Sequence, residues 1–199
     1  MRLISISVSV LAVATGVIAD ILDFSDFTLK CGTTLPIPVP YHGFIITNAV
    51  AINTTGDINC HAHSGGGGPW GKSSSPPNSL TSNSNSVTFA TYDTTKTFSL
   101  SSLNVSSDLP SDVYRRPNTL ANATWVFNFD GVARKESWVV PPKARSQRFT
   151  VPVNAKDAKS ATIGLEWDYV DENGAPHNVP AYELYVDDVV YEFSGSYSK

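Results

Sequence analysis

The chain has 199 residues, of which 41% are hydrophobic and only 16% are charged, with a formal charge of −4 at pH 7. Soluble domains carry roughly 25% charged residues, so this composition excludes a helical bundle or coiled coil, whose exposed faces are rich in Glu, Lys and Arg. The weakly negative charge gives no basic footprint for nucleic acid or for an anionic membrane. Ser, Thr and Asn replace the charged residues, which favours strands and turns.

The N-terminus predicts secretion. Met1-Arg2 precedes an apolar run over residues 3–18, and the small residues Val17 and Ala19 fit a signal peptidase site after Ala19. We therefore expect a signal peptide over residues 1–19, one extracellular domain over residues 20–199, and no membrane segment after cleavage. A membrane anchor or a buried N-terminal strand is the alternative for the same run.

Periodicity predicts an all-β fold. The two clearest strands, residues 122–129 and 161–169, alternate apolar and polar side chains and place Trp125 and Trp167 on inward faces. Strands are also expected over residues 21–24, 43–52, 86–92, 97–105, 137–140, 148–153 and 182–193. In residues 97–105 the apolar phase slips between Leu100 and Leu103, as at a β-bulge. Turn-forming residues separate the strands, which favours an antiparallel β-sandwich of the jelly-roll kind.

A long segment rich in Gly, Ser and Pro, residues 64–86, predicts a mobile loop over the domain. Within it, residues 66–73 match the phosphate-loop pattern G-x-x-x-x-G-K-[ST]. That motif needs a preceding buried strand and a helix that begins at the lysine. The paired Pro76 and Pro77 would stop such a helix, so a glycine-rich surface loop explains the match better than nucleotide binding.

Secretion changes the interpretation of the cysteines and of the asparagines. In an oxidising compartment Cys31 and Cys60 are expected to form one disulfide, although two free or intermolecular thiols are the alternative. Asn53, Asn104 and Asn122 each begin an N-x-S/T sequence and are candidate glycosylation sites in a eukaryotic host.

Histidines and acids supply candidate metal and catalytic groups. His61 and His63 would lie on one side of an extended segment and, with His42 or Asp57, could bind zinc or copper, but exposed histidines explain this spacing equally well. Glu166 and Asp168 share the outward face of one predicted strand. Glu166 with Glu183 is the weak alternative for a polysaccharide hydrolase or lyase.

Aromatic rings near polar groups suggest a binding surface. Trp70 lies in the long loop, Tyr114 adjoins Arg115, and Trp138 precedes a Val-Val-Pro-Pro run. An exposed ring stacks on the apolar face of a sugar, so these three residues are the candidate ligand-binding platform. Each ring could instead cover an edge of the core.

Three short motifs, two in the first quarter of the chain and one near its end, resemble those of a group of known domains. Residues 21–24 (Ile-Leu-Asp-Phe), 41–48 (Tyr-His-Gly-Phe-Ile-Ile-Thr-Asn) and 184–193 (Leu-Tyr-Val-Asp-Asp-Val-Val-Tyr-Glu-Phe) resemble a loose family of secreted jelly-roll domains, similar to carbohydrate-binding modules with a galactose-binding-like sandwich. Such modules often hold a structural calcium between their first and last strands. The resemblance thus implies Asp23, Asp26 and Asp187 as calcium ligands, with oxygen donors that suit this ion.

Together these features predict a secreted, non-catalytic protein that binds a cell-wall or host glycan through exposed aromatic residues. A secreted structural or effector-like protein that acts through protein contacts is the first alternative, and the hydrolase or lyase is the second. No cofactor is expected apart from the calcium.

Overall fold

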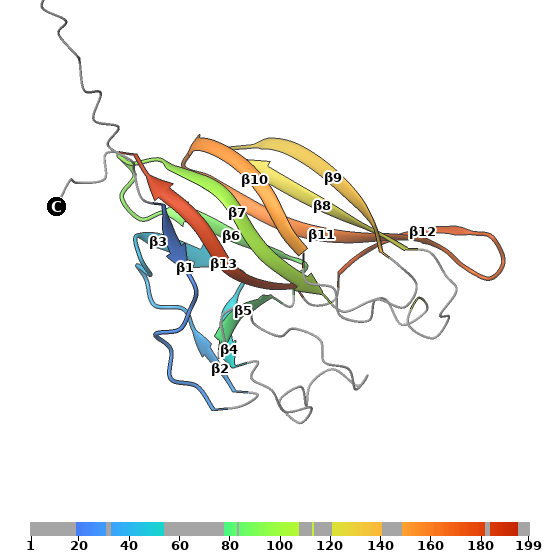
Figure 1. The fold of residues 1–199 in the computed structure, drawn as a ribbon, viewed down its shortest axis with the longest axis horizontal. Helices are drawn as coiled ribbons and strands as arrows, with labels where there is room; N and C mark the ends of the chain where they lie inside the picture. Colours follow the sequence, from blue (N-terminus) through green and yellow to red (C-terminus); the bar gives the residue numbers. More distant parts are fainter. Residues whose placement is uncertain are drawn as a thin grey trace, which may run out of the picture.

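The computed structural model describes residues 19–30, 33–53, 78–82, 84–107, 113, 121–140, 149–181 and 184–194. For Glu136, Trp138, Val139, Val140 and Phe149 it describes only the backbone. The described chain consists of strands and their connections, which pack as two antiparallel sheets in a sandwich (Figure 1). The prediction of an all-β sandwich is confirmed, whereas its jelly-roll strand order stays a prediction.

The seven-stranded sheet is built around the last strand of the chain, which pairs with three others. Its order is β10 (Phe149–Ala158), β7 (Phe98–Ser107), β13 (Leu184–Phe193), β5 (Asn78–Ser82), β4 (Val50–Asn53) and β2 (Thr34–Pro36), and β1 (Asp20–Leu22) also pairs with β13. The six-stranded sheet has the order β3 (Phe44–Thr47), β6 (Ser86–Thr91), β11 (Ser160–Val170), β8 (Ala121–Phe129) and β9 (Val132–Val140), and β12 (Pro176–Pro180) pairs with β11.

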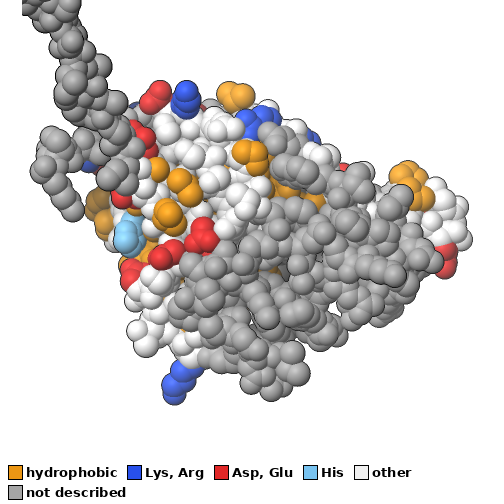
Figure 2. Space-filling model, in the orientation of Figure 1, with side chains coloured by type: hydrophobic (Ala, Val, Ile, Leu, Met, Phe, Trp, Pro, Cys, Tyr) orange, Lys and Arg blue, Asp and Glu red, His pale blue; other side chains and the backbone are white. Residues whose placement is uncertain are grey.

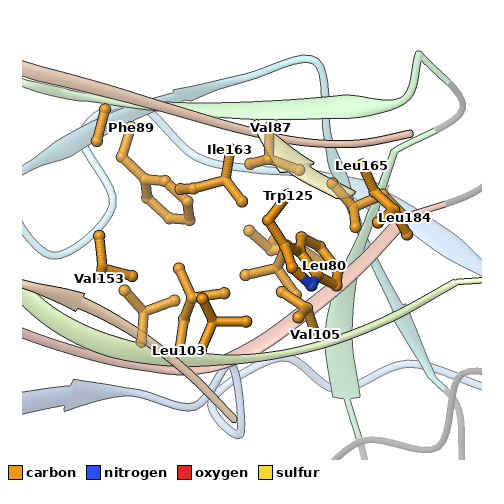
Figure 3. Packing of buried hydrophobic residues seen from close by; sticks show 14 of the residues in the cluster. Leu80, Val87, Phe89, Leu103, Val105, Trp125, Val153, Ile163, Leu165 and Leu184 are labelled. Carbon is orange, nitrogen blue, oxygen red and sulfur yellow. The ribbon is translucent and has the colours of Figure 1, made fainter. Parts of the chain in front are cut away.

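Alternating apolar residues from both sheets fill the space between them. Trp125 on β8 and Trp167 on β11 are buried, as the alternation predicts. Close up, Phe89 and Ile163 of the six-stranded sheet face Val153 and Leu103 of the other sheet (Figure 3). Because every second residue of β8 and β11 is committed to this core, the residues between them lie on the outer face of the six-stranded sheet.

Two expectations about the N-terminal half are wrong in detail. Residues 43–52 form two strands, β3 and β4, because Asn48 adopts a left-handed conformation with φ of 62° and turns the chain from one sheet to the other. The predicted loop over residues 64–86 extends too far, because residues 78–82 form the buried strand β5 between β13 and β4. Its Ser and Asn content concealed this strand.

The predicted bulge in β7 is confirmed. Leu100 pairs with Tyr191 and Ser102 pairs with Val190, so the extra residue lies between Leu100 and Ser102. A second irregularity follows at Asp188 on β13, which has a φ of 44°. The two bulges together keep the apolar residues of both strands on the core side.

The hairpin formed by β11 and β12 projects from one end of the sandwich (Figure 1). Its turn is organised by Asp171, whose Oδ1 accepts hydrogen bonds from the backbone N–H groups of Asn173 and Ala175, at 2.8 and 2.9 Å. The His177 ring lies 3.0 Å from Asp171 Oδ2 and stacks on Tyr169. The hairpin thereby widens the outer face of the six-stranded sheet by one strand. Within the described ranges, no helix has the length and apolar character needed to cross a membrane.

Candidate functional site

Polar side chains from four neighbouring strands meet on the outer face of the six-stranded sheet. The register aligns them in adjacent rows: Asn178 of β12 and Asp168 of β11 in one row, and Glu166 of β11, Thr124 of β8 and Ser137 of β9 in the next. Lys135 of β9 follows in the third row. We call these residues the polar cluster: Thr124, Lys135, Ser137, Glu166, Asp168 and Asn178.

Hydrogen bonds join the polar cluster across all four strands. Asn178 Nδ2 donates to Asp168 Oδ1 at 2.6 Å and lies 3.3 Å from Glu166 Oε2. The Thr124 hydroxyl donates to Asp168 Oδ2 at 2.5 Å and lies 2.8 Å from the Ser137 hydroxyl. The arrangement therefore presents two carboxylates that are already fixed in place by amide and hydroxyl groups.

An ion pair sets the charge state of the cluster. Lys135 Nζ lies 2.8 Å from Glu166 Oε2, and the side chains are 58% and 26% exposed. The hydrogen bond from Lys135, helped by that from Asn178, holds the pKa of Glu166 below its ordinary value, although partial burial and the nearby Asp168 carboxylate act in the opposite direction. Glu166 is thus an ionised acceptor at neutral pH.

Sequence reasoning predicted only part of the polar cluster. It placed Glu166 and Asp168 on one outward face, which the structure confirms. Asn178 belongs to none of the strands that the sequence predicts, so its place in the cluster follows only from the structure. Two strand-like segments separated by an Asn-Gly-containing turn are the signal that could have predicted this hairpin.

A second polar group lies near the end of the molecule that carries β1 and β3. The Tyr41 hydroxyl donates to Asp26 Oδ1, and His42 Nε2 lies 3.4 Å from Asp26 Oδ2. Burial, together with the hydrogen bond and negative charge of Asp26, strongly raises the pKa of Tyr41. In the space-filling view, acidic and hydrophobic side chains gather next to a histidine at this end (Figure 2). Tyr41 is therefore a neutral hydrogen-bond donor that anchors the Asp26 loop.

The three acids implied as calcium ligands are not gathered into one site. Asp23 Oδ1 accepts hydrogen bonds from the backbone and hydroxyl of Ser25, whereas Asp26 is engaged by Tyr41. Asp187 is buried on β13 opposite Asn104. In the described part of the chain, no group of three or more His, Cys, Asp or Glu side chains is arranged to hold a metal ion.

Several predicted site residues lie outside the described residues. These are Trp70, Tyr114, Glu183, both cysteines (Cys31 and Cys60), the histidines His61 and His63 with Asp57, and the phosphate-loop match. Trp138 is described only by its backbone in β9, where it pairs with Ala123. The aromatic platform, the disulfide and the histidine metal site therefore stay predictions.

Comparisons with known proteins assign no family to the chain. Neither a scan of protein families nor a search of curated proteins finds a match. Among solved structures, the chain is similar to a carbohydrate-binding module, TmCBM61, described in complex with beta-1,4-galactotriose. The identity is 7% and the TM-score is 0.31, over 76% of this chain and 88% of that chain.

Proposed function

We propose that the protein is a secreted, non-catalytic carbohydrate-binding domain and that its binding surface is the polar cluster. The observation that carries this proposal is the convergence of carboxylates, an amide, hydroxyls and an ammonium group from four strands on one sheet face. The cluster lies on regular strands, which hold such groups more precisely than loops do.

The chemistry of the cluster suits a polyhydroxyl ligand. Each sugar hydroxyl can donate one hydrogen bond and accept others, so it is best met by acceptors and donors placed side by side. Asp168 and Glu166 accept, while Asn178 and Lys135 donate. Hydrogen bonds to charged groups contribute about 1.5–3 kcal/mol each, so a few of them give a weak but specific site.

The charge state of Glu166 favours binding over hydrolysis. A glycosidase needs one carboxylic acid that is still protonated near neutral pH, which requires a raised pKa. Lys135 lowers the pKa of Glu166 instead. Asp168 is already engaged, since it accepts hydrogen bonds from both Thr124 and Asn178. Glu166 is therefore suited to accepting sugar hydroxyls and unsuited to protonating a glycosidic oxygen.

The aromatic platform predicted from the sequence completes the proposal. We propose that an aromatic ring from Trp70 or Tyr114 supplies a stacking surface beside the polar cluster, because sugar recognition combines hydrogen bonds with an apolar ring contact.

The proposal is tested with a glycan array. The array is probed with protein made in a bacterial periplasm, where the chain receives no N-linked glycans. We expect Asp168→Asn and Asn178→Ala to weaken binding of the best array glycan by about tenfold or more, since each removes a hydrogen bond to a charged group. Asp93→Asn is the matched control, because Asp93 lies in an exposed turn, where its Oδ1 accepts hydrogen bonds from the backbone and hydroxyl of Thr95.

Unchanged binding in both cluster variants would show that the ligand does not use this face. In that case a Trp70→Ala, Tyr114→Ala double variant decides whether the aromatic residues bind alone. A protein that binds no array glycan, although it is folded by circular dichroism, contradicts the function itself.

A further inference from the structure

The three asparagines of the N-x-S/T sequences lie in very different surroundings. Asn53 at the end of β4 is buried, and its Nδ2 donates to the carbonyl oxygen of Leu29 at 2.7 Å. Asn104 on β7 is half-buried, and its Nδ2 donates to Asp188 Oδ2 at 2.9 Å while its Oδ1 accepts from Thr150 at 2.6 Å. A sugar on either amide would have to displace or crowd these contacts.

Asn122 is different because its side chain is exposed on the outer face of the six-stranded sheet. It pairs with Asp168 of β11, and it precedes Thr124 by two residues, so it lies on the same face as both. Directly opposite residues on one face of an antiparallel pair have Cβ atoms about 5 Å apart. A group attached to Asn122 therefore begins within one strand spacing of the polar cluster.

We propose that Asn122 carries an N-linked glycan whose first sugar covers the polar cluster, so that the modification closes the binding site. The inference rests on the proposed function, since it describes how that same site is regulated. The donor is an oligosaccharide linked to a lipid diphosphate. The Asn122 Nδ2 atom forms a bond to C1 of the first sugar, the bond between C1 and the diphosphate oxygen breaks, and the amide loses one proton as the lipid diphosphate leaves.

The closing interaction follows from the same chemistry as ligand binding. The attached sugar carries hydroxyl groups that can hydrogen-bond to Asp168 and Asn178, the groups proposed to receive an external glycan. Because the sugar is tethered next to these groups, its effective concentration there exceeds that of a free ligand. An external glycan must displace it before it can bind.

Glycopeptide mapping and glycan binding, both on protein secreted from a eukaryotic host, test the inference. We expect mapping to find Asn122 occupied. We expect Asn122→Gln protein to bind the best array glycan about tenfold more tightly than the glycosylated wild type, and as tightly as wild type from a bacterial periplasm. The control is Ser106→Ala, which removes the Asn104 acceptor sequence on the other sheet and should leave the wild-type affinity of the secreted protein unchanged.

Each contrary result has a separate meaning. If mapping finds no glycan on Asn122, the inference is overturned, whatever the binding data show. If Asn122 carries a glycan but wild type and Asn122→Gln bind the array glycan equally well, the glycan does not close the site, and the proposed function stands. Absence of binding by both Asn122→Gln and bacterial protein overturns the proposed function and closure together, and mapping then still decides the modification.

Discussion

Arg134 on β9 donates a hydrogen bond from Nη2 to the carbonyl oxygen of Val153 on β10, at 2.7 Å, and so joins the edge strands of the two sheets. The Arg134 guanidinium group also lies over the rings of Phe127 and Phe129, with its central carbon 5.2 and 5.9 Å from the two ring centroids. Arg134 thus bridges the two sheets, packing through its aliphatic stem and binding through its guanidinium head.

Replacing Arg134 by Met should destabilise the protein. The change keeps an apolar stem but removes the charged hydrogen bond and the cation–π contacts, so we expect a loss of about 1.5–3 kcal/mol in the free energy of unfolding. Urea unfolding followed by Trp fluorescence measures it. Lys156→Met on the exposed side of β10 is the matched control and should stay within about 0.5 kcal/mol. Equal effects of the two changes would deny Arg134 this bridging role.

The turn before β3 predicts a second stability effect. Tyr41 and Phe44 exchange two backbone hydrogen bonds of 2.9 Å around His42 and Gly43, which have φ of 47° and 84°. A Cβ on Gly43 would lie 2.9 Å from Cε2 of Phe193. Gly43→Ala should therefore cost about 1–2 kcal/mol for the backbone and about 1–3 kcal/mol for the overlap.

Gly174→Ala separates the two contributions to the Gly43 effect. Gly174 has a similar φ of 80°, but a Cβ there would meet nothing within 4 Å, so only the backbone cost applies. Thermal unfolding of both variants gives the difference. If Gly174→Ala destabilises the protein as much as Gly43→Ala does, the Phe193 contact contributes nothing.

Glu166 should make stability depend on pH in the acid range. Because its pKa is lower in the folded protein than its ordinary value of 4.5, its stabilising contribution is fully present above that value and is lost as pH falls through the folded pKa. Glu166→Gln should therefore flatten the acid limb of the plot of unfolding free energy against pH.

Lys135→Met should raise the pKa of Glu166, as measured by NMR titration of its carboxyl carbon. If the pKa of Glu166 is the same in Lys135→Met as in the wild type, Lys135 is not the cause of the lowered pKa.

Strands with a regular alternation of apolar and polar residues could be predicted from the sequence. A strand without that alternation, held in place mainly by backbone pairing with its neighbours, could not. In β8 and β11 the strict alternation around Trp125 and Trp167 reveals the core face directly. In β5 only Leu80 is apolar, and the strand exists because β13 and β4 pair with it on both sides. Long-range pairing of this kind leaves no mark in the local sequence.

The same contrast applies to the candidate site. Glu166 and Asp168 are two residues apart on one strand, so their shared face follows from the period of a strand. Asn178, Thr124 and Lys135 reach them from three other strands, and that meeting depends on register. Alternation specifies the face that a strand buries, but a slip of two residues preserves that face, so alternation alone does not specify which residues a strand pairs with.

Asn78, the first residue of β5, gives the last prediction. Its side chain is buried, and Nδ2 donates to the carbonyl oxygens of Phe24 and Phe27 at 3.1 and 2.7 Å, which ties the loop after β1 to the seven-stranded sheet. Asn78→Ala would leave these carbonyls without that donor, at a cost of about 2–3 kcal/mol. Hydrogen exchange should show lost protection at the Phe27 amide, which donates to Phe24 O. Asn122→Ala, an exposed asparagine on a strand, should change stability by about 0.5 kcal/mol or less. Retained protection at Phe27 in Asn78→Ala would mean that β1 and the Tyr41 contacts hold this loop without Asn78.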